Sequence, residues 1–116
     1  ILSIGTMAKN VTNALNLVEE KSYFSHYDMR FVKPLDEALL HIIFKKYSTI
    51  ITVEDGTVKG GFGGAVLEFS AANNYKNSIK ILGIPDEFIE HGSIDRLQHK
   101  IGLDADSLAK TFHFYL

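Results

Sequence analysis

A cluster of glycines follows an apolar run near the middle of the chain, in the stretch EDGTVKGGFGGAVLEF. Such a turn between a strand and a helix can bind phosphate, because its backbone N–H groups point at the anion. The dinucleotide fingerprint G-x-G-x-x-G is half present, since Gly61 and Gly63 match but Val66 takes the third position. The Gly-Lys-Ser/Thr ending of a P-loop is also missing. We therefore predict a structural role, with positive φ angles and close helix–sheet packing, for Gly60, Gly61, Gly63 and Gly64.

The acidic residue that opens this stretch, Glu54, stands at the predicted end of a strand. Open α/β sheets bind ligands at the carboxyl edge of their strands, so Glu54 could face a cleft. We favour a second interpretation, in which its carboxylate accepts hydrogen bonds from the following loop or pairs with a base such as Arg30. An anion held at the helix N-terminus after the glycines is the alternative.

A second group of titratable residues lies in PDEFIEH, which brings together Asp86, Glu87, Glu90 and His91. The five histidines of the chain show no zinc-ligand spacing with a third ligand nearby. A metal or acid–base site here is therefore disfavoured against a solvated turn or docking loop, which would begin at Pro85. Cysteine is absent, so neither disulfides nor thiol chemistry are available.

The stretch RFVKPLD joins a predicted strand to a helix. Arg30 and Asp36 are expected to pair across this corner, Lys33 lies within it, and Pro34 fixes its shape. Asp36 and Glu37 open the helix with negative charge, which the helix dipole favours. We interpret the corner as structural.

Composition bounds the function further. The formal charge is −2 and no run of Lys or Arg exceeds two residues, which disfavours nucleic-acid binding. No apolar run is long enough to cross a membrane. A chain of 116 residues fits one domain, residues 1–116. Because ILSIG opens directly inside an apolar strand, we expect this domain to be a piece of a longer polypeptide.

Hydrophobic periodicity predicts strands that alternate with helices, which is typical of a three-layer α/β/α, Rossmann-like fold. The expected strands are residues 1–4, 24–32, 49–53 and 78–82. Three intervening segments carry apolar stripes at helical spacing, on Met7, Val11, Ala14 and Val18, on Leu39, Ile42 and Ile43, and on Phe62, Val66 and Phe69. A helical tail follows, with Ser93 and Asp104 as expected N-caps, Gly102 ending the first helix, and Leu108, Phe112 and Tyr115 as the stripe of the second.

Four stretches together resemble one known family. MRFVKPLDEALL, TIITVEDGTVKGGFGGAVLEF, LGIPDEFIEHGS and KIGLDADSLAKTF are similar to the C-terminal, transketolase-type domain of 1-deoxy-D-xylulose-5-phosphate synthases. The resemblance runs from residue 1 to about residue 112. The strand-end glutamate, the glycine-rich turn and the R-x-x-K-P-L-D corner are shared more widely among transketolase C-terminal domains, whereas LGIPDEFIEHG and GLDADSL are specific to the synthases.

The resemblance implies a mostly parallel sheet with strand order 2-1-3-4, lacking an antiparallel edge strand that precedes residue 1 in the family. It implies a cytoplasmic bacterial enzyme, a homodimer that uses thiamine diphosphate and Mg²⁺ to join pyruvate to glyceraldehyde 3-phosphate with release of CO₂, for isoprenoid, thiamine and pyridoxal synthesis. EDG does not match the family's Gly-Asp-Gly metal motif, and the family's reactive residues belong to other domains. We therefore expect no catalytic, cofactor or metal residue here, an inactive isolated fragment, and contacts to other domains of the same chain and to the dimer partner.

Structural or interface roles are expected for Arg30, Lys33, Pro34, Asp36, Glu54, Gly60, Gly61, Gly63, Pro85, Asp86 and His91. Other hypotheses for the role of the chain stay open. The chain could instead be the C-terminal domain of a 2-oxoacid dehydrogenase β subunit or of a transketolase, against which the GLDADSL tail argues. It could also be an anion-binding module that uses the glycine loop, or an assembly domain without a ligand.

Overall fold

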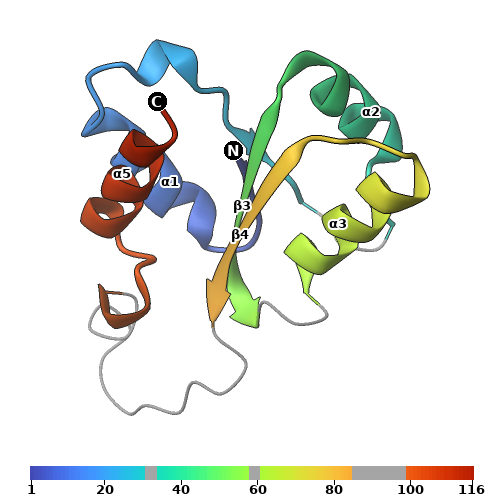
Figure 1. The fold of residues 1–116 in the computed structure, drawn as a ribbon. Helices are drawn as coiled ribbons and strands as arrows, with labels where there is room; N and C mark the ends of the chain where they lie inside the picture. The colour runs from blue at the N-terminus through green and yellow to red at the C-terminus, as the bar shows by residue number, and fades with distance from the viewer. Residues whose placement is uncertain (31–33, 58–60, 85–98) are drawn as a thin grey trace.

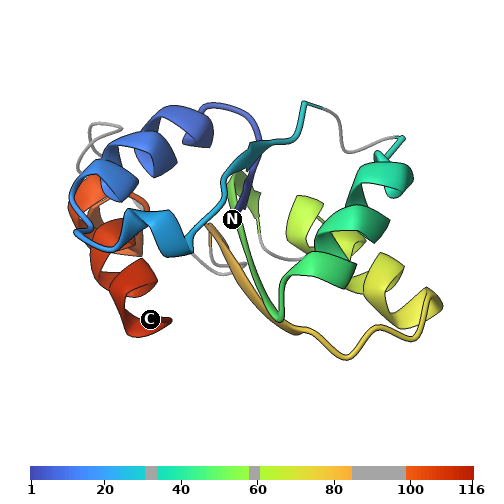
Figure 2. The same ribbon diagram turned by 90° about the horizontal axis from the view of Figure 1, so that it is seen from above.

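The computed structural model describes residues 1–30, 34–57, 61–84 and 99–116. A parallel sheet lies between two layers of helices, with α1 and α5 on one face and α2 and α3 on the other (Figures 1 and 2). The sheet order is β2-β1-β3-β4, which confirms the predicted order and fold class. The elements are β1 (Leu2–Ser3), α1 (Met7–Asn16), the 3₁₀ helix η1 (Lys21–Tyr23), β2 (Tyr27–Asp28), α2 (Glu37–Lys46), β3 (Thr49–Thr57), α3 (Phe62–Ala72), β4 (Ser78–Ile84) and α5 (Ala105–Phe114).

All four strands differ in their bounds from the prediction, and β2 and β3 differ most. β3 continues through EDG to Thr57, with a register shift after Val53, so Glu54 lies within the strand and not at its end. β2 is shorter than the predicted 24–32, although the Met29 N–H still donates to the Ser3 carbonyl at 2.7 Å. Before β2, the Ser25 hydroxyl bonds to Tyr47 and His26 Nε2 lies 2.6 Å from Ser3 Oγ. Of the remaining predicted residues, 31–32 are outside the described part.

Side-chain alternation along β3 divides the core between the two faces of the sheet. Ile50 packs with α2 and α3 in one cluster, whereas Ile51 and Val53 pack with α1 and α5 in the other. The predicted apolar side chains of one helix pack into each cluster. The stripe of α1 is buried at Met7, Val11 and Ala14, and Val18, two residues after the helix ends, is buried as well. The stripe of α3 is buried at Phe62, Val66 and Phe69.

The predicted stripe of α2 is wrong at one position. Ile42 was expected to face the sheet, but its side chain is 61% exposed. The buried residues of α2 are Leu40, Ile43 and Phe44, at the i, i+3, i+4 spacing that defines one helix face. Ile42 follows Leu40 by two residues, which is about 200° around the helix, and therefore points to the opposite side.

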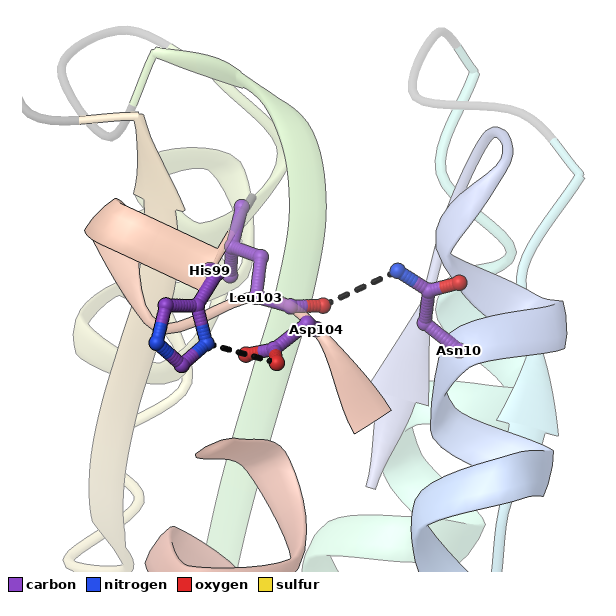
Figure 3. Close-up of polar contacts among 4 residues, drawn as sticks. All are labelled: Asn10, His99, Leu103 and Asp104. Carbon is purple, nitrogen blue, oxygen red and sulfur yellow. Dashed lines mark hydrogen bonds and ion pairs between the residues drawn. The ribbon is translucent and has the colours of Figure 1, made fainter. Parts of the chain in front are cut away.

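The helical tail completes the core of the α1 face. Leu103, Leu108 and Phe112 are buried against α1 and β3. Asn10 on α1 donates through Nδ2 to the Leu103 carbonyl at 2.9 Å, beside the turn that leads into α5 (Figure 3). The tail is therefore an integral layer of the fold.

Two of the predicted helix boundaries in the tail are confirmed. Gly102 ends the helical residues 99–101 with a φ of +80°, which only glycine adopts readily. Asp104 is the N-cap of α5, and its carboxylate oxygen Oδ2 lies 2.9 Å from His99 Nδ1 (Figure 3). The predicted cap at Ser93 lies outside the described residues.

Candidate functional site

The best candidate location for a ligand is the carboxyl edge of β1 and β3. In the order β2-β1-β3-β4, the chain crosses from β1 outward to β2 and then crosses back to β3 on the other side of β1. The carboxyl ends of β1 and β3 therefore form the topological switch point, where open α/β sheets bind ligands. Ser3 pairs with Val53, and the Ile4 N–H donates to the Val53 carbonyl at 3.1 Å. The residues that follow, Gly5 and Thr6 on one side and Glu54 and Asp55 on the other, therefore define the candidate site.

The Glu54 carboxylate lies at the N-terminus of α3. Its residue is only 3% exposed, and carboxylate oxygen Oε2 accepts a hydrogen bond from the Phe62 backbone N–H at 2.5 Å. Burial raises the pKa of Glu54, opposed by the N–H groups of Phe62 and Gly63, with Asp55 adding to the rise. The second oxygen, Oε1, is buried without a hydrogen-bond partner. The prediction that Glu54 accepts a bond from the following loop region is confirmed at Phe62.

Asp55 accepts hydrogen bonds at the N-terminus of α1. Its Oδ2 accepts from the Thr6 backbone N–H at 3.3 Å and from the Thr6 hydroxyl at 2.8 Å. The close approach requires glycine at the preceding position, because a Cβ on Gly5 would lie 2.8 Å from Asp55 Oδ1 and Gly5 has a φ of +68°. Our sequence reasoning did not single out Asp55, although an acidic neighbour of Glu54 in a strand must face the opposite helix layer.

The alternation of side chains along β3 thus places one carboxylate at each helix N-terminus of the switch point. These are the positions at which a phosphate would accept N–H bonds and interact with the helix dipole. A phosphate would have to displace the carboxylates or approach two like charges. The arrangement therefore disfavours the anion-binding alternative.

The glycine cluster is explained by packing at one position. A Cβ on Gly63 would lie 2.5 Å from Ile81 Cγ2 and 2.7 Å from Thr52 Oγ1, a side-chain pair that is in register across β3 and β4. The predicted close helix–sheet packing is therefore confirmed. The predicted positive φ is wrong for the described members, since Gly61 has a φ of −92° and the described glycines with positive φ are Gly5 and Gly102. Gly60 lies outside the described residues.

In the described part of the R-x-x-K-P-L-D corner, the predicted ion pair between Arg30 and Asp36 is not formed. Asp36 is the N-cap of α2 and its Oδ1 accepts from the Leu39 N–H at 3.1 Å. Asp36 and Arg30 line a hollow of about 250 Å³ with Pro34, and Arg30 is exposed and forms no ion pair with either Asp36 or Glu54. The bonded N–H lies three positions after Asp36, which is the usual reach of an N-cap side chain. Lys33 is outside the described residues.

Three further predicted residues, Pro85, Asp86 and His91, lie outside the described part of the chain, with the rest of the PDEFIEH cluster. Within the described ranges no group of three or more His, Asp or Glu side chains is placed to hold a metal ion. None of the helices described there has the length and apolar character needed to cross a membrane.

Comparison with known proteins gives one consistent picture. A family model described as "Transketolase, C-terminal domain" matches residues 1–108. The chain is 55% identical over 111 residues to the 1-deoxy-D-xylulose-5-phosphate synthase of Parabacteroides distasonis, covering 95% of this chain and 18% of that protein. It is 52% identical over 112 residues to the synthase of Cytophaga hutchinsonii, covering 96% of this chain and again 18% of the relative. The chain thus spans about a fifth of the length of these relatives.

A solved structure shares the fold. It is described as "Split gene transketolase, inactive beta4 tetramer" and matches with a TM-score of 0.77 at 26% identity. The match covers 97% of this chain and 36% of that one. The similarity extends through the helical tail as well as the sheet.

Proposed function

We propose, on the premise that the chain belongs to the transketolase C-terminal domain family, that it serves as the C-terminal domain of a 1-deoxy-D-xylulose-5-phosphate synthase. The observation that carries the proposal is identity of 55% and 52% to two such synthases over nearly the whole chain. GLDADSL lies in this matched region and, with Leu103 and Leu108, forms part of the buried core.

In the whole enzyme, the reaction joins pyruvate to glyceraldehyde 3-phosphate and releases CO₂. Thiamine diphosphate, held with Mg²⁺, acts there as the electron sink for carbon–carbon bond formation. The described residues at the switch point of the sheet do not fit that group. A diphosphate needs free N–H donors and a cation, whereas Asp55 and Glu54 already accept from the two helix N-termini at the switch point. We therefore place the cofactor on other domains and expect the isolated chain to be inactive.

The role that remains for this domain is support. It covers neighbouring domains of the same polypeptide and contributes to a homodimer in the bacterial cytoplasm. The exposed large apolar side chains of the described residues, which include Tyr23 and Phe114, are consistent with surfaces that are covered in a larger assembly. The solved relative described as a β4 tetramer supports the same view of the fold as an assembly element.

A domain exchange tests the proposal. The matching 111-residue segment of the Parabacteroides distasonis synthase is replaced by the corresponding residues of this chain, and synthesis of 1-deoxy-D-xylulose 5-phosphate is measured. We expect the chimera to retain activity, and a matched chimera that carries a transketolase C-terminal domain to lose it. A folded chimera of this chain with no synthase activity would refute the proposal, and equal rescue by the transketolase domain would remove its specificity.

Calorimetry on the 116-residue chain tests the cofactor statement separately. We expect no tight binding of thiamine diphosphate with Mg²⁺ and none of inorganic phosphate. Tight, Mg²⁺-dependent binding would contradict the location of the cofactor on other domains. Binding of phosphate alone would revive the anion-binding alternative.

A further inference from the structure

At the junction of β3 and α3, two buried side-chain oxygens of the described residues have no hydrogen-bond partner. They are Thr52 Oγ1 and Glu54 Oε1, on residues that are 0% and 3% exposed. Both residues reach the first turn of α3. Glu54 accepts from the Phe62 N–H through its other oxygen, Oε2, at 2.5 Å. Thr52 Oγ1 lies 2.7 Å from the position that a Cβ on Gly63 would take. Buried polar atoms are normally hydrogen-bonded, so this pair needs an explanation.

No basic side chain of the described residues forms an ion pair with Glu54. The helices on this face of the sheet and the strands beside β3 carry Glu37, His41, Lys45 and Lys46 on α2, Glu68 on α3 and Lys80 on β4, and none on β1. All are exposed except half-buried His41, whose Nδ1 lies 2.6 Å from Tyr75 Oη. The next residue of the strand, Asp55, is itself acidic. An ionised Glu54 would therefore be a buried charge without a cation, which costs much more than a buried neutral carboxyl.

A neutral carboxyl at Glu54 accounts for both unpartnered oxygens. A protonated carboxyl has one O–H donor and one carbonyl oxygen that accepts. Oε2 is the accepting oxygen, because it bonds the Phe62 N–H. Oε1 then carries the proton, and the Thr52 hydroxyl is the unpartnered acceptor at the same helical turn. We propose that Glu54 is a proton-operated conformational switch, whose protonated carboxyl bonds Phe62 and Thr52 and holds the first turn of α3 on the sheet, and whose loss of the proton opens that turn.

The proton couples the opening of this turn to pH. Burial raises the pKa of Glu54 in the closed turn, against the opposing N–H groups of Phe62 and Gly63. In the open turn the carboxyl is solvated and has the ordinary glutamate pKa of about 4.3. Opening therefore releases the proton. The opening equilibrium should increase by up to about tenfold for each pH unit between the ordinary and the raised pKa, and should level off above the raised value.

Hydrogen exchange on the full-length protein, read by mass spectrometry, tests the proposal. Exchange of residues 62–69 is followed from about pH 4 to pH 8 and corrected for the intrinsic pH dependence of amide exchange, so that it reports opening. The helix α1 is the internal control, because its residues 7–16 include no Asp, Glu or His. We expect the opening of residues 62–69 to increase with pH and that of α1 to stay constant. Equal behaviour of the two segments would overturn the proposal.

Glu54→Gln tests whether Glu54 is the titrating group. Its amide keeps one donor and one acceptor for the same two partners but has no proton to lose, so α3 should stay closed at every pH. Asp55→Asn is the matched control, which removes the neighbouring carboxylate and should keep the wild-type response. A response that persists in Glu54→Gln, or that disappears in Asp55→Asn, would assign the titration to another group and overturn the proposal.

Thr52→Val tests the partner of the proton, with Thr52→Ser as the control that keeps the hydroxyl. A hydrogen bond to the neutral carboxyl raises its pKa, whereas a hydrogen bond to the carboxylate lowers it. If Thr52 accepts from protonated Glu54, the valine variant should show its pH-dependent opening over a shorter pH interval, and the serine variant should match the wild type. A longer interval would mean that Thr52 donates to the carboxylate, and an unchanged one that it bonds neither form. Either result would overturn the proposal.

Discussion

The substitution Gly63→Ala tests whether the glycine loop serves packing. Gly63 is the second residue of α3 and lies over the register pair formed by Thr52 and Ile81. The added methyl group would lie 2.5 Å from Ile81 Cγ2 and 2.7 Å from Thr52 Oγ1. Carbon atoms in favourable contact are about 3.5–4.0 Å apart, so the helix would have to move away from the sheet or the side chains would have to rotate.

The expected magnitude combines two opposing effects. Overpacking of a close-packed core costs about 1–3 kcal/mol, and fully buried Thr52 leaves little room to relax, which places Gly63→Ala in the upper part of that range. Replacing glycine by alanine within a helix returns at most about 1 kcal/mol. We therefore expect a net loss of about 1–2 kcal/mol in the free energy of unfolding. For a domain of this size that corresponds to a fall in Tm of roughly 5–10 °C.

The assay is urea unfolding followed by circular dichroism, with Gly56→Ala as the matched control. A Cβ on Gly56 would meet no atom within 4 Å, so this variant should equal or slightly exceed the wild type in stability. Adding Ile81→Ala to Gly63→Ala should cost less than the sum of the two single changes, because the methyl group then has space. A Gly63→Ala variant as stable as the wild type would refute the packing explanation.

Three further predictions follow from buried and exposed positions. Phe112→Ala should lower the free energy of unfolding by about 3–5 kcal/mol, because the Phe112 side chain of α5 is fully buried in the core that α5 shares with α1. Phe114→Ala should change the free energy of unfolding of the 116-residue chain by less than about 0.5 kcal/mol, because Phe114 is exposed. Urea unfolding measures both. Burial raises the pKa of Glu54, so the folded chain binds the carboxyl proton more tightly than the unfolded chain does. The stability of the wild type relative to Glu54→Gln should therefore fall as pH rises above the ordinary glutamate pKa of about 4.3. A stability difference that stays constant between about pH 4 and pH 8 would contradict this prediction. Gly102→Ala should cost about 1–2 kcal/mol through its φ of +80°, since no atom opposes the added methyl group, and a variant of unchanged thermal stability would exclude this backbone strain.

The sequence by itself determined the layers of this protein. Apolar spacing at Met7, Val11 and Ala14, and again at Phe62, Val66 and Phe69, is a local property that predicts which helix face is buried, and all six side chains are buried. N-cap and glycine signals likewise predicted two boundaries in the tail, where Gly102 ends one helix and Asp104 begins the next. The family resemblance gave the strand order that the sheet has.

Only the tertiary structure decided what the polar residues do. Asp55 bonds Thr6 across 49 positions of sequence, and Asn10 reaches Leu103 across 93, so no local pattern could pair them. The predicted Arg30–Asp36 ion pair is not formed, and the Asp36 carboxylate instead accepts a hydrogen bond from the Leu39 N–H of α2. The sequence left two roles for Gly63, in a phosphate-binding loop or in close helix–sheet packing. The structure favours packing because Ile81 lies against Gly63, and that contact is set by the fold and not by the glycine itself.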